Sequence, residues 1–328
     1  MVNRKKFLFF LVFFLAPLSL FFKSFTAYFS QDDFFHLRAS QGNLIQNFNY
    51  FFSFSSLRGY AFYRPLSREV YNNLMWHLFG LNPLPFHLVQ YLIFLGNLFL
   101  LDKFLGGWFV KSLKIRILTI FLYAVSAVHL GTFYYLGSIQ ILLAMSFILL
   151  TLIFFQKKKY LLSYLFFCLA LLCHEISYLT PSLLFMVSSK RSKKIKLITP
   201  FLILVLVFSC LNLYLIGLPK QEPYLPKFSL RGMINNLFWY GLWGIGVPEH
   251  LVDYVGPGLK INSRIILQYP IHFWLMVILV FLLTFSLAMK LISQKEEPLL
   301  YKKLFLSGCW FLVTCGIFLI LPTHRFVY

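Results

Sequence analysis

Residues 139–159 read IQILLAMSFILLTLIFFQKKK. An apolar run of this length that ends in three lysines is typical of a helix that crosses a membrane and stops on the cytoplasmic side. The whole chain agrees, because 59% of its 328 residues are hydrophobic, only 12% are charged, and the mean hydropathy is +0.76. This composition excludes a soluble globular domain, a disordered chain and a disulfide scaffold. It predicts an all-α fold, a polytopic transmembrane helix bundle.

Apolar runs of the same character recur along the chain, at 7–27, 84–105, 115–135, 139–155, 161–187, 197–217, 271–289 and 304–321. The formal net charge of +20 does not indicate nucleic acid as a partner, because the positive residues form short clusters between these runs instead of one basic face. The positive-inside rule places such clusters in the cytoplasm. The sequence therefore predicts a multi-pass integral protein of the bacterial inner (cytoplasmic) membrane, with a cytoplasmic N-terminus and the lipid bilayer as its partner.

The run at 161–187 decides how many segments there are, because basic clusters flank it on both sides. If both flanks are cytoplasmic, the run crosses an even number of times, yet it is too short for two full spans of about 20 residues each. We therefore expect a short helical hairpin that turns near residues 173–176, with Pro181 breaking the returning arm. A single long tilted span is the alternative.

With the hairpin counted as two, the chain has about nine membrane segments in a single domain, 1–328, and its C-terminus lies outside. The run at 7–27 is expected to be an uncleaved first span and not a signal peptide. Two outer loops result, a first at 28–83 that carries interfacial helices and a second at 218–270. Seven of the ten acidic residues fall on this outer side, which suggests that the chemistry is there.

The first outer loop opens with two adjacent carboxylates, Asp32 and Asp33, followed by His36. On a helix either acid shares a face with the histidine. Repulsion between the acids and their position beside a membrane span should raise the pKa of one of them. This pattern suits a general base near neutral pH, or two ligands for a divalent metal. The alternative is that Asp32 or Asp33 caps a short interfacial helix.

Further along the same loop, Arg64, Arg68 and Asn72 recur at intervals of four residues. Pro65 is a favourable first residue for a helix that would end at Gly80. The three side chains would then form one polar stripe, and arginine forks bind phosphate with two hydrogen bonds. The helix is equally consistent with an interfacial amphipathic helix whose arginines meet lipid head groups.

Two more pairs of ionisable residues are candidates for ligand contact. His174 and Glu175 stand at the expected hairpin turn, where an ionisable pair at membrane depth is functional by default. An ion pair between Glu175 and an arginine of the first outer loop is the alternative. His324 and Arg325 follow the last apolar run, where they would contact a ligand or anchor the helix.

Several of these motifs occur in an order that resembles a known family. They are Asp32-Asp33, Tyr63-Arg64-Pro65-Leu66, Asn82-Pro83 with His87, the hairpin acid Glu175, and the closing Thr323-His324-Arg325-Phe326-Val327-Tyr328. Together they resemble the GT-C membrane glycosyltransferases, and most closely the protein O-mannosyltransferase relatives and their bacterial homologues. Members of that family continue past this point, so the resemblance also implies that the sequence is a piece of a longer protein.

The resemblance implies an inverting transfer of a sugar from a polyprenyl-phosphate-linked donor to an acceptor hydroxyl outside the cytoplasm. Asp33 or Asp32 would be the base, and Arg64 and Arg68 would stabilise the departing phosphate. No cofactor is required, although Asp32 and Asp33 permit a divalent metal. The other function classes to weigh are a lipid or solute transporter or flippase and a non-catalytic subunit of the same fold.

Overall fold

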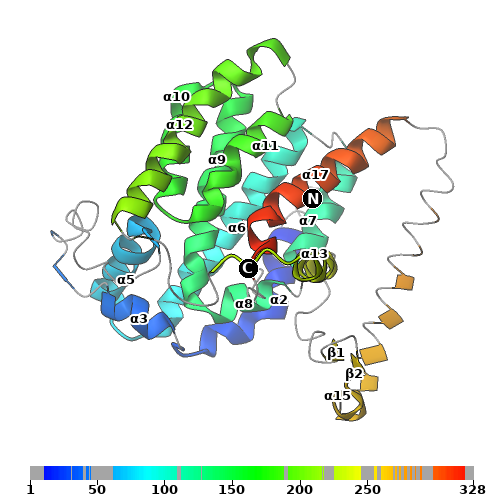
Figure 1. The fold of residues 1–328 in the computed structure, drawn as a ribbon. Coiled ribbons are helices and arrows are strands. Elements are labelled where there is room, and N and C mark those ends of the chain that lie inside the picture. Colours follow the sequence, from blue (N-terminus) through cyan, green and yellow to red (C-terminus); the bar gives the residue numbers. More distant parts are fainter. Residues whose placement is uncertain are drawn as a thin grey trace, which may run out of the picture.

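The computed structural model describes residues 11–30, 32–39, 42–43, 45, 62–108, 112–126, 128–187, 191–215, 217, 225–244, 255–256, 260–268 and 298–321, with isolated residues between 270 and 289. This part of the chain is helical apart from one antiparallel pair of two-residue strands, β1 (Val255–Gly256) and β2 (Lys260–Ile261). The longer helices run side by side as a bundle, and α3 and α5 lie at one end of it (Figure 1). The expectation of an all-α fold is therefore confirmed for these residues.

The elements follow the chain in three groups. The first contains η1 (Leu11–Leu15), α2 (Ala16–Phe21), η2 (Phe22–Thr26), α3 (Asp32–Ala39), η4 (Pro65–Val70) and α5 (Tyr71–Phe79). The second contains α6 (Pro83–Trp108), α7 (Leu113–Ala124), α8 (His129–Tyr134), η5 (Leu136–Ser138), α9 (Ile139–Gln156), α10 (Tyr160–Leu171), η6 (Glu175–Leu179), α11 (Thr180–Val187) and α12 (Arg191–Leu215). The third contains α13 (Leu230–Gly244), α15 (Ser263–Gln268) and α17 (Pro298–Leu319).

Three of the described helices are long and apolar enough to cross a membrane: Pro83–Gly107, Leu136–Gln156 and Ile195–Tyr214. Shorter apolar helices occupy Phe13–Thr26, Tyr160–Leu171 and Phe305–Gly316. A few membrane-crossing helices indicate a membrane protein, whereas the described residues do not establish a bundle of nine spans. At the centre α9 packs against α6 and α10, around a core that includes Leu149, Leu152 and Phe167.

The apolar run at 115–135 is not one continuous helix, contrary to the expectation from the sequence. The first part, α7, ends at Ala124, and α8 begins at His129. The ring of His129 approaches the Tyr123 carbonyl oxygen, with Nε2 at 2.8 Å, and so satisfies a group that the end of α7 exposes. Hydropathy could not reveal this break, because the residues on both sides of the turn are apolar.

The predicted hairpin is present. α10 ends at Leu171, and the chain turns before η6 and α11. The next helix, α12, starts beside the first half of α10, because the Tyr164 hydroxyl lies 3.5 Å from the Leu197 carbonyl oxygen. The chain therefore returns to its starting end through η6 and α11. Pro181 does not break the returning arm as expected: it stands in the first turn of α11, where its missing N–H leaves no hydrogen bond unmade.

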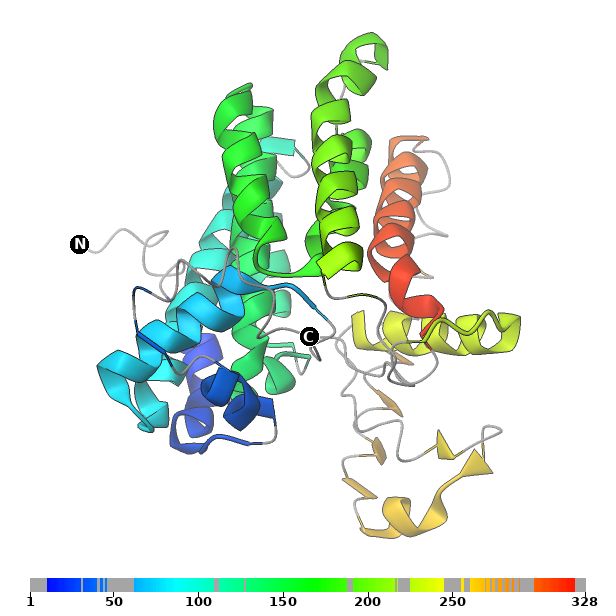
Figure 2. The same ribbon diagram turned by 60° about the vertical axis from the view of Figure 1, so that its left-hand side comes forward.

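The two ends of the bundle differ in charge. The turn of three lysines at 157–159 lies at the end away from α3 and α5 (Figures 1 and 2). At the lysine end, Arg116 pairs with Asp102, with Nε 2.9 Å from Oδ1. Gly106 lies under the Arg116 guanidinium, in a space that a Cβ atom would fill. The end that carries α3 and α5 holds the candidate site.

Candidate functional site

Four segments that are distant in sequence meet at this end of the bundle. They are α3, the π-helix η4, the η5–α9 junction and η6, and hydrogen bonds or ion pairs link each to another. A small apolar cluster supports them, formed by Phe29, Leu37, Met75, Phe86 and Leu136. The site is therefore built by tertiary packing and not by one local motif.

Asp33 joins α3 to the start of α9. Its Oδ2 accepts the Ser30 N–H at 3.0 Å, which is the capping-box arrangement, and its Oδ1 accepts the Gly137 N–H at 2.9 Å. The residue is 2% exposed, and this burial raises the pKa of its carboxyl although the two N–H groups oppose the rise. Asp33 is therefore a buried residue within α3 that accepts two backbone N–H groups, and not a solvated N-cap.

Asp32 has a different environment from its neighbour. It is exposed to solvent, and its Oδ2 lies 3.5 Å from the Tyr135 hydroxyl. The two carboxylates therefore do not act as one unit: Asp33 is committed to backbone N–H groups, whereas Asp32 remains open to a ligand. No cluster of three or more His, Cys, Asp or Glu side chains that would hold a metal ion occurs among the described residues.

The η4 segment docks onto the end of α10. The Leu66 N–H donates to the Leu172 carbonyl at 3.2 Å, and the Ser67 hydroxyl donates to the Cys173 carbonyl at 2.6 Å. These are carbonyl groups that the end of a helix leaves without intrahelical partners. The docking brings Arg64, which immediately precedes η4, to the first residue of η6, Glu175.

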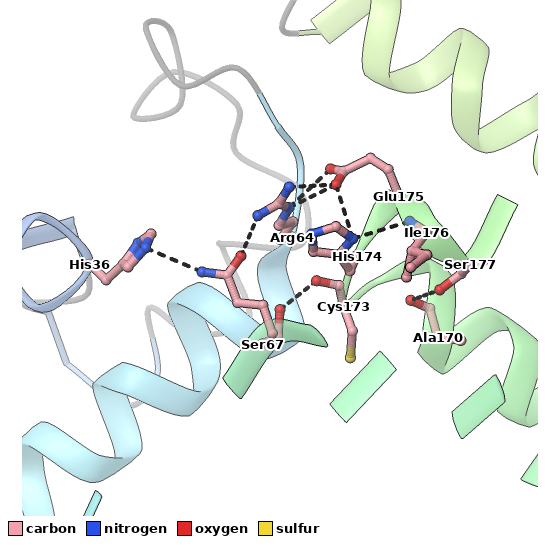
Figure 3. Close-up of polar contacts among 10 residues, drawn as sticks. His36, Arg64, Ser67, Ala170, Cys173, His174, Glu175, Ile176 and Ser177 are labelled. Carbon is pink, nitrogen blue, oxygen red and sulfur yellow. Dashed lines mark hydrogen bonds and ion pairs between the residues drawn. The ribbon is translucent and has the colours of Figure 1, made fainter. Parts of the chain in front are cut away.

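Arg64 holds the centre of the site (Figure 3). Its Nε lies 3.1 and 2.9 Å from the two Glu175 carboxylate oxygens, its Nη2 lies 2.6 Å from Oε2, and its Nη1 donates to Gln140 Oε1 at 2.7 Å. The guanidinium also lies over the ring of Phe62, 4.5 Å from its centroid. Burial opposes ionisation of Glu175, but the positive charge of Arg64 and its hydrogen bonds outweigh this effect and lower the pKa of Glu175. The ion pair that the sequence left open as an alternative for Glu175 is thus present.

His36 completes the chain of contacts on the α3 side. Its Nε2 lies 3.3 Å from Gln140 Nε2, so Gln140 links His36 to Arg64. Burial, together with the positive charges of Arg68 and Arg64, lowers the pKa of His36 from 6.5 to about 3. The imidazole is therefore neutral at physiological pH and accepts the amide hydrogen.

This environment makes stability depend on pH. His36 binds a proton more readily in the unfolded chain, so its contribution to folding is complete above pH 6.5 and decreases as the pH falls toward about 3. Replacing His36 by glutamine should flatten the dependence of the unfolding temperature on pH in that window. Thermal unfolding of both proteins in detergent between pH 7.5 and 4.5 measures this. Parallel profiles for the two proteins would contradict it.

Arg64, Arg68 and Asn72 differ in exposure. Arg64 is partly exposed, whereas Arg68, in the π-helical turn of η4, is only 4% exposed and pairs with the adjacent Glu69. The Asn72 amide donates to the Arg68 carbonyl oxygen at 2.8 Å. The interpretation in which lipid head groups meet Arg68 is wrong, because that side chain is buried.

Three candidate residues remain: His174, His324 and Arg325. His174 Nδ1 accepts the Ile176 N–H at 3.1 Å and so caps η6, and it lies 3.7 Å from Glu175 Oε2. His324 and Arg325 lie outside the described residues. Gln140 and Gly137 also contact site residues, and the sequence motifs did not single them out. The available signal was a glutamine in the first turn of an otherwise apolar helix.

The arrangement as a whole places one accessible carboxylate, one buried carboxylate and a partly exposed arginine together at the end of an apolar bundle. Such a set can accept a proton from a hydroxyl and neutralise an anionic group beside it. Comparisons with protein-family models, with curated proteins and with solved structures found no match for this chain.

Proposed function

We propose that this chain is a membrane glycosyltransferase of the GT-C type, a bundle of about nine membrane segments that transfers a sugar from a polyprenyl-phosphate donor to an acceptor hydroxyl outside the cytoplasm. The observation that carries the proposal is the position of Arg64, a partly exposed cation that pairs with Glu175 at the same end of the apolar bundle as Asp32 and Asp33. That end is the one opposite the 157–159 lysine turn. A lipid-linked phosphate would meet a cation and a base there at once.

The residues then take different roles. Asp32, the exposed carboxylate, accepts the proton of the acceptor hydroxyl as that oxygen attacks the anomeric carbon. Arg64 receives the phosphate that leaves with the lipid on the opposite side of the sugar, so the anomeric configuration inverts. Asp33 is a positioning residue, because it fixes the start of α3 against Gly137.

The donor lipid also requires an apolar path to the site. An open groove on α2 is lined by Leu15, Ala16, Leu18, Ser19 and Phe22. A polyprenyl chain lying against this groove would be held by apolar side chains of α2. The site residues permit a divalent metal without requiring one.

A direct assay tests the proposal. The protein is reconstituted into vesicles with radiolabelled polyprenyl-phosphate mannose or glucose, and water-soluble and lipid-linked label are separated over time. We expect label to pass to an added hydroxyl acceptor or, with water as acceptor, to free sugar. EDTA distinguishes a metal-dependent from a metal-independent reaction. Movement of the intact donor between leaflets without cleavage would instead indicate a flippase and would overturn the proposal.

A further inference from the structure

α13 differs in direction from the other long helices. It lies across the bundle, crossing the direction of α12 and α17, at the same end as α3 and α5 (Figure 2). Both α12 and α17 reach this end with their C-terminal residues. A helix that crosses the ends of spanning helices lies in the plane of the membrane surface if those helices cross the membrane.

One side of α13 is fixed to the end of α17. The Asn236 amide donates to the carbonyl oxygens of Leu319 and Leu321, each at 3.1 Å, and the Tyr240 hydroxyl donates to the Phe318 carbonyl at 3.4 Å. These bonds satisfy carbonyl groups at the C-terminal end of α17. The position of α13 is therefore set by the main chain of an apolar helix and not by surface side chains alone.

The exposed side of α13 has two distinct faces. Leu230, Ile234 and Phe238 recur every four residues and are 75%, 59% and 54% exposed, so they form one apolar stripe without protein cover among the described residues. Arg231 and Asn235 are also exposed and form a polar stripe beside it. Successive residues of an α-helix are rotated by about 100° around its axis. The apolar stripe, the polar stripe and the side packed on α17 therefore occupy three different sides of α13.

We propose that α13 lies in the membrane interface, with the stripe of Leu230, Ile234 and Phe238 in the acyl region and Arg231 among phospholipid head groups. The occupant of the apolar stripe is the bilayer and not a protein, because α12, whose C-terminal end lies at the same end of the bundle, is long and apolar enough to cross a membrane and also exposes apolar side chains, among them Leu206 and Leu213. A cation at the edge of the stripe fits the phosphate layer of a lipid surface.

The orientation of α13 also fixes the depth of the candidate site. Because α13, α3 and α5 lie at the same end of the bundle, an interfacial α13 would bring the candidate site to the level of the head groups in the same leaflet. A phosphate on a lipid is found at that level. The inference does not depend on the transferase reaction, because it uses only the position and the exposed faces of α13.

The test compares two neighbouring positions on α13 in the full chain. A fluorescent amino acid is introduced at Ile234 or, as the matched control, at Asn235, and each protein is reconstituted into phosphatidylcholine–phosphatidylglycerol vesicles. Phospholipid brominated on its acyl chains is one quencher, and iodide in the water is the other. We expect brominated lipid to quench the probe at Ile234 several-fold more than at Asn235, and iodide to show the reverse order.

Two outcomes would overturn the inference. Equal quenching by iodide at both positions would mean that the stripe faces water. Protection of the Ile234 probe from both quenchers would mean that a second copy or another protein covers the stripe. A second pair, Leu230 with Arg231 as control, repeats the comparison at the other end of the stripe, so that the result does not depend on one substitution.

Discussion

Replacing Arg68 by methionine is expected to lower the free energy of unfolding by about 3–5 kcal/mol, because it leaves the buried Glu69 carboxylate without its counter-ion. Arg68 is 4% and Glu69 2% exposed, and Arg68 Nε lies 2.7 Å from Glu69 Oε1. The second carboxylate oxygen, Oε2, has no hydrogen-bond partner among the described residues. Burial already raises the pKa of Glu69 although Arg68 opposes the rise.

Thermal unfolding of the purified protein in detergent measures this effect. The double replacement Arg68→Met with Glu69→Leu should recover most of the loss, because it removes both charges at once. Arg38→Met is the matched control: Arg38 is exposed on α3, and its loss should change the free energy by about 0.5 kcal/mol or less. An unfolding temperature of Arg68→Met equal to that of Arg38→Met would show that the pair is not buried as described.

The second large effect concerns catalysis. Asp32→Asn should lower the rate of sugar transfer by about 10²–10⁴-fold, the usual contribution of a general base, while the unfolding temperature stays unchanged because the side chain is exposed. Asp33→Asn should instead lower the unfolding temperature, because its amide NH₂ group would face the N–H of either Ser30 or Gly137. Loss of that hydrogen-bond acceptor should lower the free energy of unfolding by about 1–3 kcal/mol.

The transfer assay and thermal unfolding, measured on both variants, separate the two roles. Wild-type transfer by Asp32→Asn would remove Asp32 from the reaction. If only Asp33→Asn loses activity while its unfolding temperature is unchanged, Asp33 and not Asp32 is the base. Loss of both activity and stability in Asp33→Asn alone fits a positioning residue.

The sequence predicted those parts of the fold that depend on composition and length. The runs at 84–105, 139–155 and 197–217 correspond to α6, α9 and α12, because a long uncharged run has no stable alternative to a helix in lipid. The hairpin was predicted because charge clusters constrain which end each segment occupies. The sequence did not predict the break before His129. This break depends on a contact of the His129 ring with a backbone carbonyl and not on a change in hydropathy.

For the candidate site, the sequence indicated residue types but not partners. Arg64 bonds to Gln140 and Glu175, which are 76 and 111 residues away, and no local pattern specifies such pairs. The helix that was expected to begin at Pro65 starts with a π-helical turn instead of an α-helical one. Within this turn Ser67 donates to the Cys173 carbonyl oxygen, a contact that only tertiary structure supplies.

The short length of α10 has a consequence for how the protein is made. Its 12 residues extend about 18 Å, well short of a hydrocarbon core of about 30 Å, and the turn that follows leaves helix-end carbonyl groups that need partners from elsewhere in the chain. Leu66 and Ser67 cover two of these groups. Ser67 precedes Cys173 by 106 residues, so the side chain that covers this turn is synthesised well before the turn itself.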